Sequence, residues 1–530
     1  MLSRQLLRRP RLAARVRRVR ALSSPHTPRF SSTETQGQAS WRAAVKGPLV
    51  PYAAGLATAS LVAYVVGRAR EPQGSAAAAA AVSAPSPAPE VGATPADDGG
   101  IPDLNALGMA GEITLSPPAS AADVTRVLNA RAFSRGGRDG VARYDGAQVA
   151  SNEPCEDTFL HGSLSTPFGA GDWLTWAVFD GHCGWQMSDL LTRELVPYVR
   201  RAFAAAGPTA DEGAVERALR DAFTALDDAV VRTAAATVDS DRTYADKARR
   251  LEAAYAGACA LLALFDPATR TLRVASTGDC RAVLGRRAAD GTWAATELTT
   301  DQTGANPDEA ARLRAQFPNE PEVVRNGRVW GMQPSRTFGD GMWKWPSALK
   351  NRLRDDYNGQ NLPSAARYGA YRDGPYLTAE PAVTTARIPD AEPSFVILAT
   401  DGLWDTMESG DAVDLVGRWL DWQARGGAAK PEEEGKGEGE GEGRQDFGPT
   451  ILGRMQLCKY EPRKAALRDA NAAVHLVRNG LGGADDETVR GALTFRYPNS
   501  RFIRDDITVQ VVFFSPTQVG PPPAPEGASR

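Results

Sequence analysis

Acidic residues stand where several apolar runs give way to short turns, and this pattern restricts the possible folds more than any other feature of the sequence. The six residues of this kind are Asp180 in V-F-D-G-H, Asp279 in S-T-G-D-C, Asp401 and Asp405 in L-A-T-D-G-L-W-D, and Asp505 and Asp506 in I-R-D-D-I-T-V. A strand delivers its last side chain to the edge of a sheet, and glycine beside it lets backbone and ion approach closely. Because carboxylates gathered there without cations would repel one another, the pattern predicts a sheet edge that binds hard metal ions.

The other potential metal ligands favour the same kind of ion. The five cysteines are scattered and lack C-x-x-C spacing, so neither a disulfide framework nor a structural zinc site is indicated. The chain has four histidines, so an imidazole-rich centre is not expected. Oxygen ligands favour magnesium or manganese.

A formal net charge of -3 over 530 residues predicts no strong attraction to nucleic acid.

Three segments before the folded region differ from it in composition. Residues 1–40 begin with nine arginines in the first 30 positions and carry no acid before Glu34, which is typical of a mitochondrial presequence; a disordered basic tail is the alternative. Residues 47–67 are uncharged and long enough for a transmembrane anchor, or else belong to a removed leader. Residues 71–120, rich in Ala, Pro, Ser and Gly, are expected to form a low-complexity linker.

The presequence predicts a mitochondrial location, in the inner membrane or the matrix. If residues 47–67 stop transfer in the inner membrane, the folded region would face the intermembrane space. If they are cleaved or fully imported, it would lie in the matrix. The sequence leaves both alternatives open.

Residues 121–516 alternate β-rich runs with amphipathic stretches and are expected to form one folded domain. Strands are predicted at 173–179, 258–265, 271–276, 282–284, 395–400 and 507–514, and helices at 186–203, 216–236, 307–316, 411–423 and 463–478. The turn D-P-A-T-R joins two of the strands as an antiparallel hairpin. Hairpins with helices before and between them predict an α+β layered domain. Residues 430–446 form an acidic, Gly-rich insertion, and residues 517–530 a disordered tail.

The turn after the apolar run W-L-T-W-A-V-F carries the first catalytic candidates. Asp180 and the exposed carbonyl of Gly181 can offer a carboxylate and a backbone oxygen to two ions. His182 follows at once and could give a proton to a leaving group; the alternative is a turn histidine that hydrogen-bonds a neighbour. Glu156 and Asp157 add two acids near an expected adjacent strand, although such a pair alone is usually solvated surface.

Taken in order, these residues resemble the metal-dependent serine/threonine protein phosphatases of type 2C. The similarity rests on E-D (156–157), V-F-D-G-H-x-G (178–184), G-A-C-A (257–260), T-G-D-C-R (277–281), S-R-T-F-G-D (335–340), A-T-D-G-L-W-D (399–405) and R-D-D-I-T-V (504–509). Each motif alone is weak, but all of them in the order of the family are specific. The resemblance implies a four-layer αββα sandwich of two antiparallel sheets flanked by helices, with a binuclear metal site at one end.

The resemblance also implies roles for single residues. The binuclear core would consist of Asp180 as a bridge, Asp401 and Asp505 on one ion, and the Gly181 carbonyl and Glu156 on the other. A weaker third site would consist of Asp279, Asp405 and Asp401. Asp506 would be a neighbour of the ligands. Two or three Mg2+ or Mn2+ ions would activate water for attack on phosphorus, and His182 would protonate the departing seryl or threonyl oxygen.

One position departs from the family. Asn152 stands four residues before Glu156, where most members have an arginine that grips phosphate, and it is the candidate substrate-binding residue. The same substitution marks the pyruvate dehydrogenase phosphatase branch, which the segments beginning at Leu298, Trp330, Pro375 and Asn471 also resemble. Losing a bidentate cation should weaken phosphate binding.

Two further residues near these segments are of interest. Arg336 could supply part of the missing phosphate contact, or it could be a buried structural arginine paired with an acid. Gln302 stands where the relatives tend to have histidine.

The sequence therefore predicts a phosphoseryl-protein phosphatase that acts on the E1 subunit of the pyruvate dehydrogenase complex. Its partners would be the phosphorylated protein and, through residues 47–67, the inner mitochondrial membrane. Three alternatives are a phosphatase of another mitochondrial phosphoprotein, a pseudophosphatase that binds a phosphoprotein without turnover, and a hydrolase of a small phosphorylated metabolite. Loss of a core carboxylate would mark a pseudophosphatase, and none is missing. A deep closed pocket would mark the metabolite hydrolase.

Overall fold

The computed structural model describes residues 120–169, 171–357, 373–427, 448–449 and 456–516. The predicted presequence, membrane segment, acidic insertion and tail lie outside these residues, as does all but the last residue of the linker. Among the helices that the structure describes, none combines the length and the apolar composition needed to cross a bilayer.

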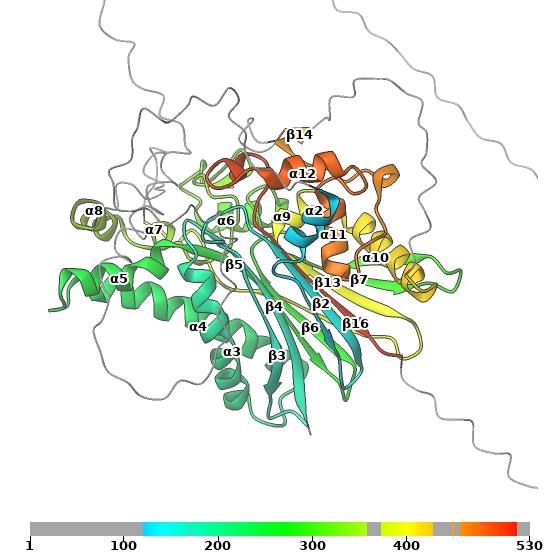
Figure 1. Cartoon of the computed structure of the whole chain (residues 1–530). Helices are drawn as coiled ribbons and strands as arrows, with labels where there is room; N and C mark the ends of the chain where they lie inside the picture. Colours follow the sequence, from blue (N-terminus) through cyan, green and yellow to red (C-terminus); the bar gives the residue numbers. More distant parts are fainter. Residues whose placement is uncertain (1–119, 170, 358–372, 428–447, 450–455, 517–530) are drawn as a thin grey trace, which may run out of the picture. The chain divides into compact units, whose positions relative to one another are not determined.

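Two antiparallel sheets form the centre of the described domain (Figure 1). The first sheet has the order β1 (Phe133–Gly136), β2 (Val141–Val149), β16 (Ile507–Phe514), β13 (Ser394–Ala399), β7 (Arg281–Arg287) and β8 (Trp293–Glu297). The second has the order β12 (Ala382–Arg387), β6 (Thr271–Thr277), β5 (Gly257–Asp266), β4 (Asp172–His182) and β3 (Thr158–Ser165), and β11 (Phe338–Gly339) also pairs with β5. The predicted hairpin is β5–β6.

Alternate residues of the central strands pack into different cores. In β4, Val178 faces the core between the sheets, whereas Phe179 faces the helices on the outside. In β13, Leu398 lies in the core between the sheets and Ile397 in the outer core. Successive side chains of a strand point to opposite faces, so strands buried on both faces read as continuous apolar runs.

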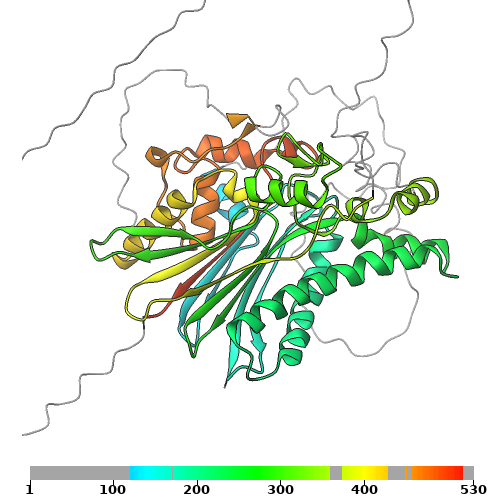
Figure 2. The ribbon, with the colours of Figure 1, turned by 180° about the vertical axis from the view of Figure 1, so that it is seen from behind.

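Helices cover both outer faces (Figures 1 and 2). On the second sheet lie α3 (Gln186–Ala206) and α4 (Glu212–Val238), and on the first α10 (Ser409–Ala424) and α11 (Ala472–Gly480). Near α11 lie α2 (Ala121–Leu128) and α12 (Asp486–Thr494). These layers confirm the predicted α+β fold with four αββα layers.

A further apolar cluster forms beside the second sheet. Its elements are α4, α5 (Tyr244–Tyr255), α6 (Pro307–Gln316), the hairpin β9 (Val324–Arg325) and β10 (Arg328–Val329), α7 (Gly341–Lys344) and α8 (Ser347–Asp356). Lys344 ties α7 to α4 because its ammonium lies 2.7 Å from the buried carboxylate of Asp227. The short elements elsewhere are α9 (Asp401–Trp404), β14 (Gly448–Pro449), β15 (Gln456–Leu457), η4 (Pro462–Lys464) and η5 (Asn499–Phe502).

The six predicted strands are all present, but one predicted helix is partly wrong. The helix expected at 463–478 is a short 3-10 turn, η4, then irregular chain, and α11 begins only at Ala472. Asn471 sets this start: its side-chain oxygen accepts the Val474 N–H, and its amide donates to the Phe133 carbonyl. An N-cap of this kind separates a helix from the chain before it.

Candidate metal centre

Three carboxylates from separate strand ends meet at one edge of the sandwich. Asp180 lies near the end of β4, Asp279 follows β6, and Asp401 is the first residue of α9, directly after β13. Each offers an oxygen, and these oxygens all lie within 4.8 Å of one another. The expectation that acids at strand ends come together therefore holds for these three.

Burial and mutual repulsion dominate the electrostatics of this cluster. Burial, and then the charge of Asp401, raises the pKa of Asp180 well above its ordinary value. Burial and the charge of Asp279 raise the pKa of Asp401 to about 6. Burial also raises the pKa of Asp279. A buried set of oxygen donors with this excess of negative charge fits hard divalent cations such as Mg2+ or Mn2+.

Glu156 and Gly181, expected to serve the second ion, lie against each other. A Cβ on Gly181 would stand 2.1 Å from the carbonyl oxygen of Glu156, so only glycine allows this approach. Burial raises the pKa of Glu156 to about 7. Glu156 immediately precedes Asp157 and β3, which pairs with β4. Asp157 is buried and accepts a hydrogen bond from the Thr400 hydroxyl at 2.8 Å.

Asp405 and Asp505 flank the cluster in different ways. Asp405 ends the turn that begins at Asp401, and its N–H donates to the Asp401 carbonyl at 2.7 Å. Burial and the charge of Asp401 raise the pKa of Asp405 to about 7. Asp505 is ion-paired with Arg501 and accepts the N–H of Asp506 at 2.7 Å. The compact triad thus contains Asp279, expected in the third site, whereas Asp505, expected in the core, is held by an arginine.

Asp506 organises the loop that carries Asn152 and Glu156. Its carboxylate accepts the backbone N–H groups of Ser151, Asn152 and Glu156 at 2.5–2.8 Å. The side-chain amide of Asn152 also donates to Asp506, at 2.9 Å. The carboxylate is thus occupied by loop hydrogen bonds, in line with its expected role as a neighbour of the ligands. The Asn152 side-chain amide therefore helps to hold the same loop in place through its hydrogen bond to Asp506.

His182 is paired with Asp340, the last residue of the S-R-T-F-G-D motif, for which the sequence predicted no individual role. Its Nε2 lies 2.8 Å from Oδ2 of Asp340, which is fully buried and adopts a left-handed backbone with φ 48°. Gly257 makes the contact feasible, since a Cβ there would stand 2.2 Å from His182 Nε2. Burial alone lowers the pKa of His182, but Asp340 outweighs it, so the net pKa is above the ordinary value. The carboxylate of Asp340 therefore favours the protonated form of the imidazole.

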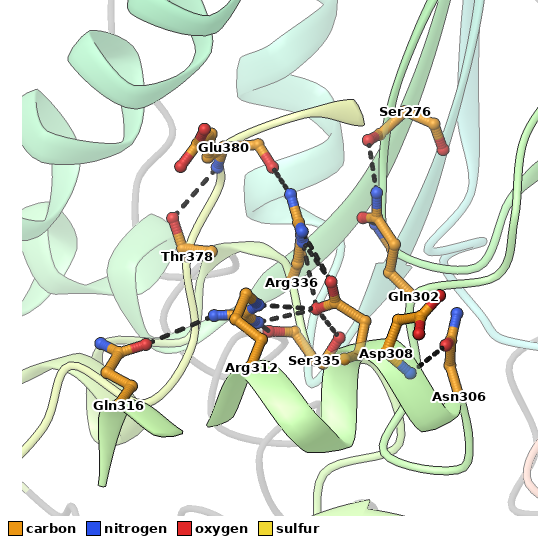
Figure 3. Close-up of polar contacts among 12 residues, drawn as sticks. Ser276, Gln302, Asn306, Asp308, Arg312, Gln316, Ser335, Arg336, Thr378 and Glu380 are labelled. Carbon is orange, nitrogen blue, oxygen red and sulfur yellow. Dashed lines mark hydrogen bonds and ion pairs between the residues drawn. The ribbon is translucent and has the colours of Figure 1, made fainter. Parts of the chain in front are cut away.

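Gln302 supports the turn that carries Asp279, and Figure 3 shows its contact with Ser276 before that turn. Its side-chain oxygen accepts the Gly278 N–H at 2.8 Å, and its amide donates to the Ser276 carbonyl at 3.1 Å. Glutamine can thus bond two groups of this turn at once. Gln302 therefore has a structural role next to Asp279, a member of the cluster.

Arg336 is held in a separate network (Figure 3). Its guanidinium binds Glu309, with Nη2 2.6 Å from Oε1, and Nη1 donates to the Glu380 carbonyl at 2.9 Å. Glu309 also accepts from Arg312 and from the Ser335 hydroxyl. These contacts support the alternative of a structural arginine paired with an acid.

A test of the fit to metal follows from the raised pKa values. A carboxyl whose folded-state pKa is raised contributes stability below its ordinary pKa, near 4, and loses it as pH rises through the folded value. Because the pKa of Asp401 is about 6 and those of Glu156 and Asp405 are about 7, the metal-free protein loses this contribution between about pH 4 and pH 7. Bound divalent cations would neutralise these carboxylates in place of the protons.

We therefore expect Mg2+ or Mn2+ to raise the melting temperature, and by more at pH 7.5 than at pH 5.5. A concentration 100 times Kd adds about 2.7 kcal/mol to the free energy of unfolding. Differential scanning fluorimetry with and without metal at each pH measures the difference, with potassium chloride of equal ionic strength as control. A metal effect that is absent, or equal at both pH values, would contradict this assignment of the cluster.

The comparisons with known proteins agree with this geometry. The family model "Protein phosphatase 2C" matches residues 148–433. A protein phosphatase 2C homolog of Schizosaccharomyces pombe is 37% identical over 411 residues, covering 75% of this chain and 86% of that protein. The mitochondrial [pyruvate dehydrogenase [acetyl-transferring]]-phosphatase 1 of Saccharomyces cerevisiae is 32% identical over 410 residues, covering 71% of this chain and 69% of that protein.

Two further similarities are more distant. The human mitochondrial [pyruvate dehydrogenase [acetyl-transferring]]-phosphatase 1 is 34% identical over 284 residues, about half of either chain. The crystal structure of serine-threonine phosphatase 2C from Toxoplasma gondii is 17% identical, with a TM-score of 0.41 over 72% of this chain and 99% of that one.

The strand-end carboxylates and these matches define a class of enzyme that removes phosphate with divalent metal ions. The chain belongs to the protein phosphatase 2C family and is a metal-dependent protein serine/threonine phosphatase.

Proposed function

We propose that this phosphatase hydrolyses phosphoserine on the E1 subunit of the pyruvate dehydrogenase complex. The triad of Asp180, Asp279 and Asp401 carries the catalytic part of the proposal, because it keeps the carboxylates that a metal-dependent hydrolase needs. The substrate part is supported by relatives at 32–36% identity whose names describe pyruvate dehydrogenase phosphatases. Asn152, read as a mark of that branch, supports it as well and is proposed to lie at the substrate.

The ligands proposed for the cations are those of the resemblance, grouped around the triad. They are Asp180, Asp401, Asp505, Glu156, the Gly181 carbonyl, and Asp279 and Asp405. Bound Mg2+ or Mn2+ would supply an activated water and neutralise charge on the phosphoryl group. The end of β4 and the turns after β6 and β13 hold the carboxylates before substrate arrives, so little reorganisation is needed during the reaction.

His182 is proposed as the general acid. Asp340 holds its Nε2 at 2.8 Å, which leaves Nδ1 as the ring atom that can donate a proton to the departing seryl oxygen. The negative charge of Asp340 favours the protonated ring. Asp340 thus acts as a positioning residue, because it acts on the reaction through the histidine.

A mitochondrial location is proposed together with this substrate. It is supported by the arginine-rich composition of residues 1–40 and by the mitochondrial relatives. Protease treatment of intact and of swollen mitochondria tests it: protection that is lost only when the inner membrane is ruptured supports the matrix. Digestion after rupture of the outer membrane alone would place the domain in the intermembrane space.

The substrate is tested by comparing phosphoproteins under equal conditions. Phosphate release from phosphorylated E1 and from a phosphorylated protein of unrelated sequence is measured with Mn2+. We expect kcat/KM to be at least about tenfold higher for E1, a difference of about 1.4 kcal/mol in transition-state binding. Equal values would favour the alternative of another phosphoprotein substrate. No release from either would favour the pseudophosphatase.

A further inference from the structure

Arg501 lies at the boundary between solvent and the acidic cluster. It belongs to the 3-10 helix η5 and stands four residues before Asp505, whose carboxylate its Nη1 contacts. The side chains of Arg501 and Asp505 are 30% and 28% exposed, whereas Asp279 is buried and Asp180 and Asp401 are partly buried. The guanidinium is therefore a cation that a ligand entering from solvent could reach.

Other arginines of the motif segments are committed to their own partners. Arg281 binds Asp301 at 2.7 Å and the Ser409 hydroxyl at 2.9 Å, Arg336 binds Glu309, and Arg504 donates to the carbonyls of Ala492, Phe495 and Ala150. Arg504 is also 93% buried. These contacts hold loops together, and using any of them for a ligand would leave buried groups without partners.

The charge of Arg501 acts on two further acids of the cluster. Burial raises the pKa of Glu156 and of Asp401, and the charge of Arg501 opposes that rise at both. These two acids belong to different parts of the chain, the loop before β3 and the start of α9. The charge of Arg501 therefore acts on two acids of the cluster in addition to Asp505, the acid that its side chain contacts.

We infer that Arg501 binds the phosphoryl group of the substrate, an inference that rests on the proposed function. A phosphate monoester presents several charged oxygens, and the planar guanidinium can bond two of them at once. Within the described residues, the contacts of Arg501 use Nη1, so Nε and Nη2 are open to such a ligand. Asn152 cannot provide this charge, because it is neutral and its amide is bound to Asp506.

The pair with Asp505 also explains how Arg501 would be held for this task. A bound metal ion would share the Asp505 carboxylate and so weaken its attraction for the guanidinium. The weakened ion pair would still keep the Arg501 side chain in place, while the other N–H groups of the guanidinium turn to the substrate. Lys459 is a second cation near the cluster, but its ammonium donates to the backbone carbonyl of Asp405. A flexible ammonium also matches phosphate geometry less well than a guanidinium does.

The test compares Arg501→Ala and Arg501→Lys with Arg496→Ala, an exposed arginine of the same loop. KM for a phosphoseryl peptide, Ki for inorganic phosphate and the Mn2+ concentration for half-maximal activity are measured at saturating levels of the other components. We expect Arg501→Ala to raise KM and Ki by about 10- to 100-fold, and Arg501→Lys by less. Arg496→Ala should leave both unchanged, and melting curves should show all three variants folded.

Two results would overturn the inference. If KM and Ki stay unchanged while the Mn2+ requirement rises, Arg501 serves only to position Asp505. If Arg496→Ala weakens phosphate binding as much as Arg501→Ala does, the effect comes from a general loss of positive charge. A wild-type protein that releases no phosphate would instead overturn the proposed function. Calorimetry of inorganic phosphate binding to the Mn2+-loaded protein then tests Arg501 by itself, with the same loss of affinity expected.

Discussion

Replacing Asp180 with Asn is expected to lower kcat/KM for a phosphoseryl peptide by about 10³-fold, equivalent to about 4 kcal/mol. Asp180 shares the triad with Asp279 and Asp401, and it also accepts the Asp401 N–H at 3.4 Å. The amide keeps the size of the side chain but removes a charge that the cations need. Steady-state kinetics with saturating Mn2+ measures the loss.

The control for this variant is Asp172→Asn. Asp172 begins the same strand at its other end, where its carboxylate accepts a hydrogen bond from the Ser165 hydroxyl. Activity should stay within about twofold of wild type, because this site is remote from the triad. The metal-free Asp180→Asn protein should also melt no lower than metal-free wild type, since the substitution relieves repulsion. Wild-type activity in Asp180→Asn would contradict the role of the triad.

The second large effect is expected for His182→Gln. Without the imidazole, kcat for a phosphoseryl peptide should fall by about 10²- to 10⁴-fold, because a seryl alkoxide leaves poorly unless it is protonated. The value of kcat for a nitrophenyl phosphate should fall far less, because nitrophenolate can leave without being protonated. Measuring both substrates separates proton donation from damage to the site.

Asp340→Asn and His161→Gln complete this experiment. Asp340→Asn keeps a group within reach of His182 Nε2 but removes the charge that favours the protonated ring. The fall in kcat should therefore be smaller than in His182→Gln, and it should again be selective for the phosphoseryl peptide. His161 lies in β3 beside Tyr144, in an aromatic cluster, and its replacement should not change the ratio of the two substrates. Equal losses with both substrates in His182→Gln would indicate a structural histidine.

Several features of the fold were predictable because their signals are local. The helix α6 has the predicted bounds, since Asn306 caps it and Pro307 occupies its first turn. The central strands are continuous apolar runs because both faces are buried. The strands β1 and β12 were missed because they are edge strands, short or largely exposed, with little apolar pattern.

The candidate site was predictable only in part, because only some of its residues belong to local sequence patterns. Carboxylates at strand ends have a local pattern, and Asp180 and Asp401 were found from it. Asp340 reaches His182 from 158 positions away along the chain, and no local pattern marks such a contact. Asp506 likewise serves a loop more than 350 residues earlier.

The arginines show how far charge alone can guide such predictions. For Arg336 the sequence left both a phosphate contact and a structural ion pair open, and the structure places Glu309 beside it. Arg501 carried a local signal, its spacing of four residues from Asp505, which suits an ion pair on one helical turn. Which arginine is free to bind a ligand depends on tertiary partners.

Metal removal and return test the central claim most directly. Full-length protein is stripped with chelator, and phosphate release from a phosphoseryl peptide is followed as Mg2+ or Mn2+ is added back. The triad and its flanking acids predict no release in chelator and a saturable return of activity with either ion. Undiminished phosphate release in excess chelator would contradict the account.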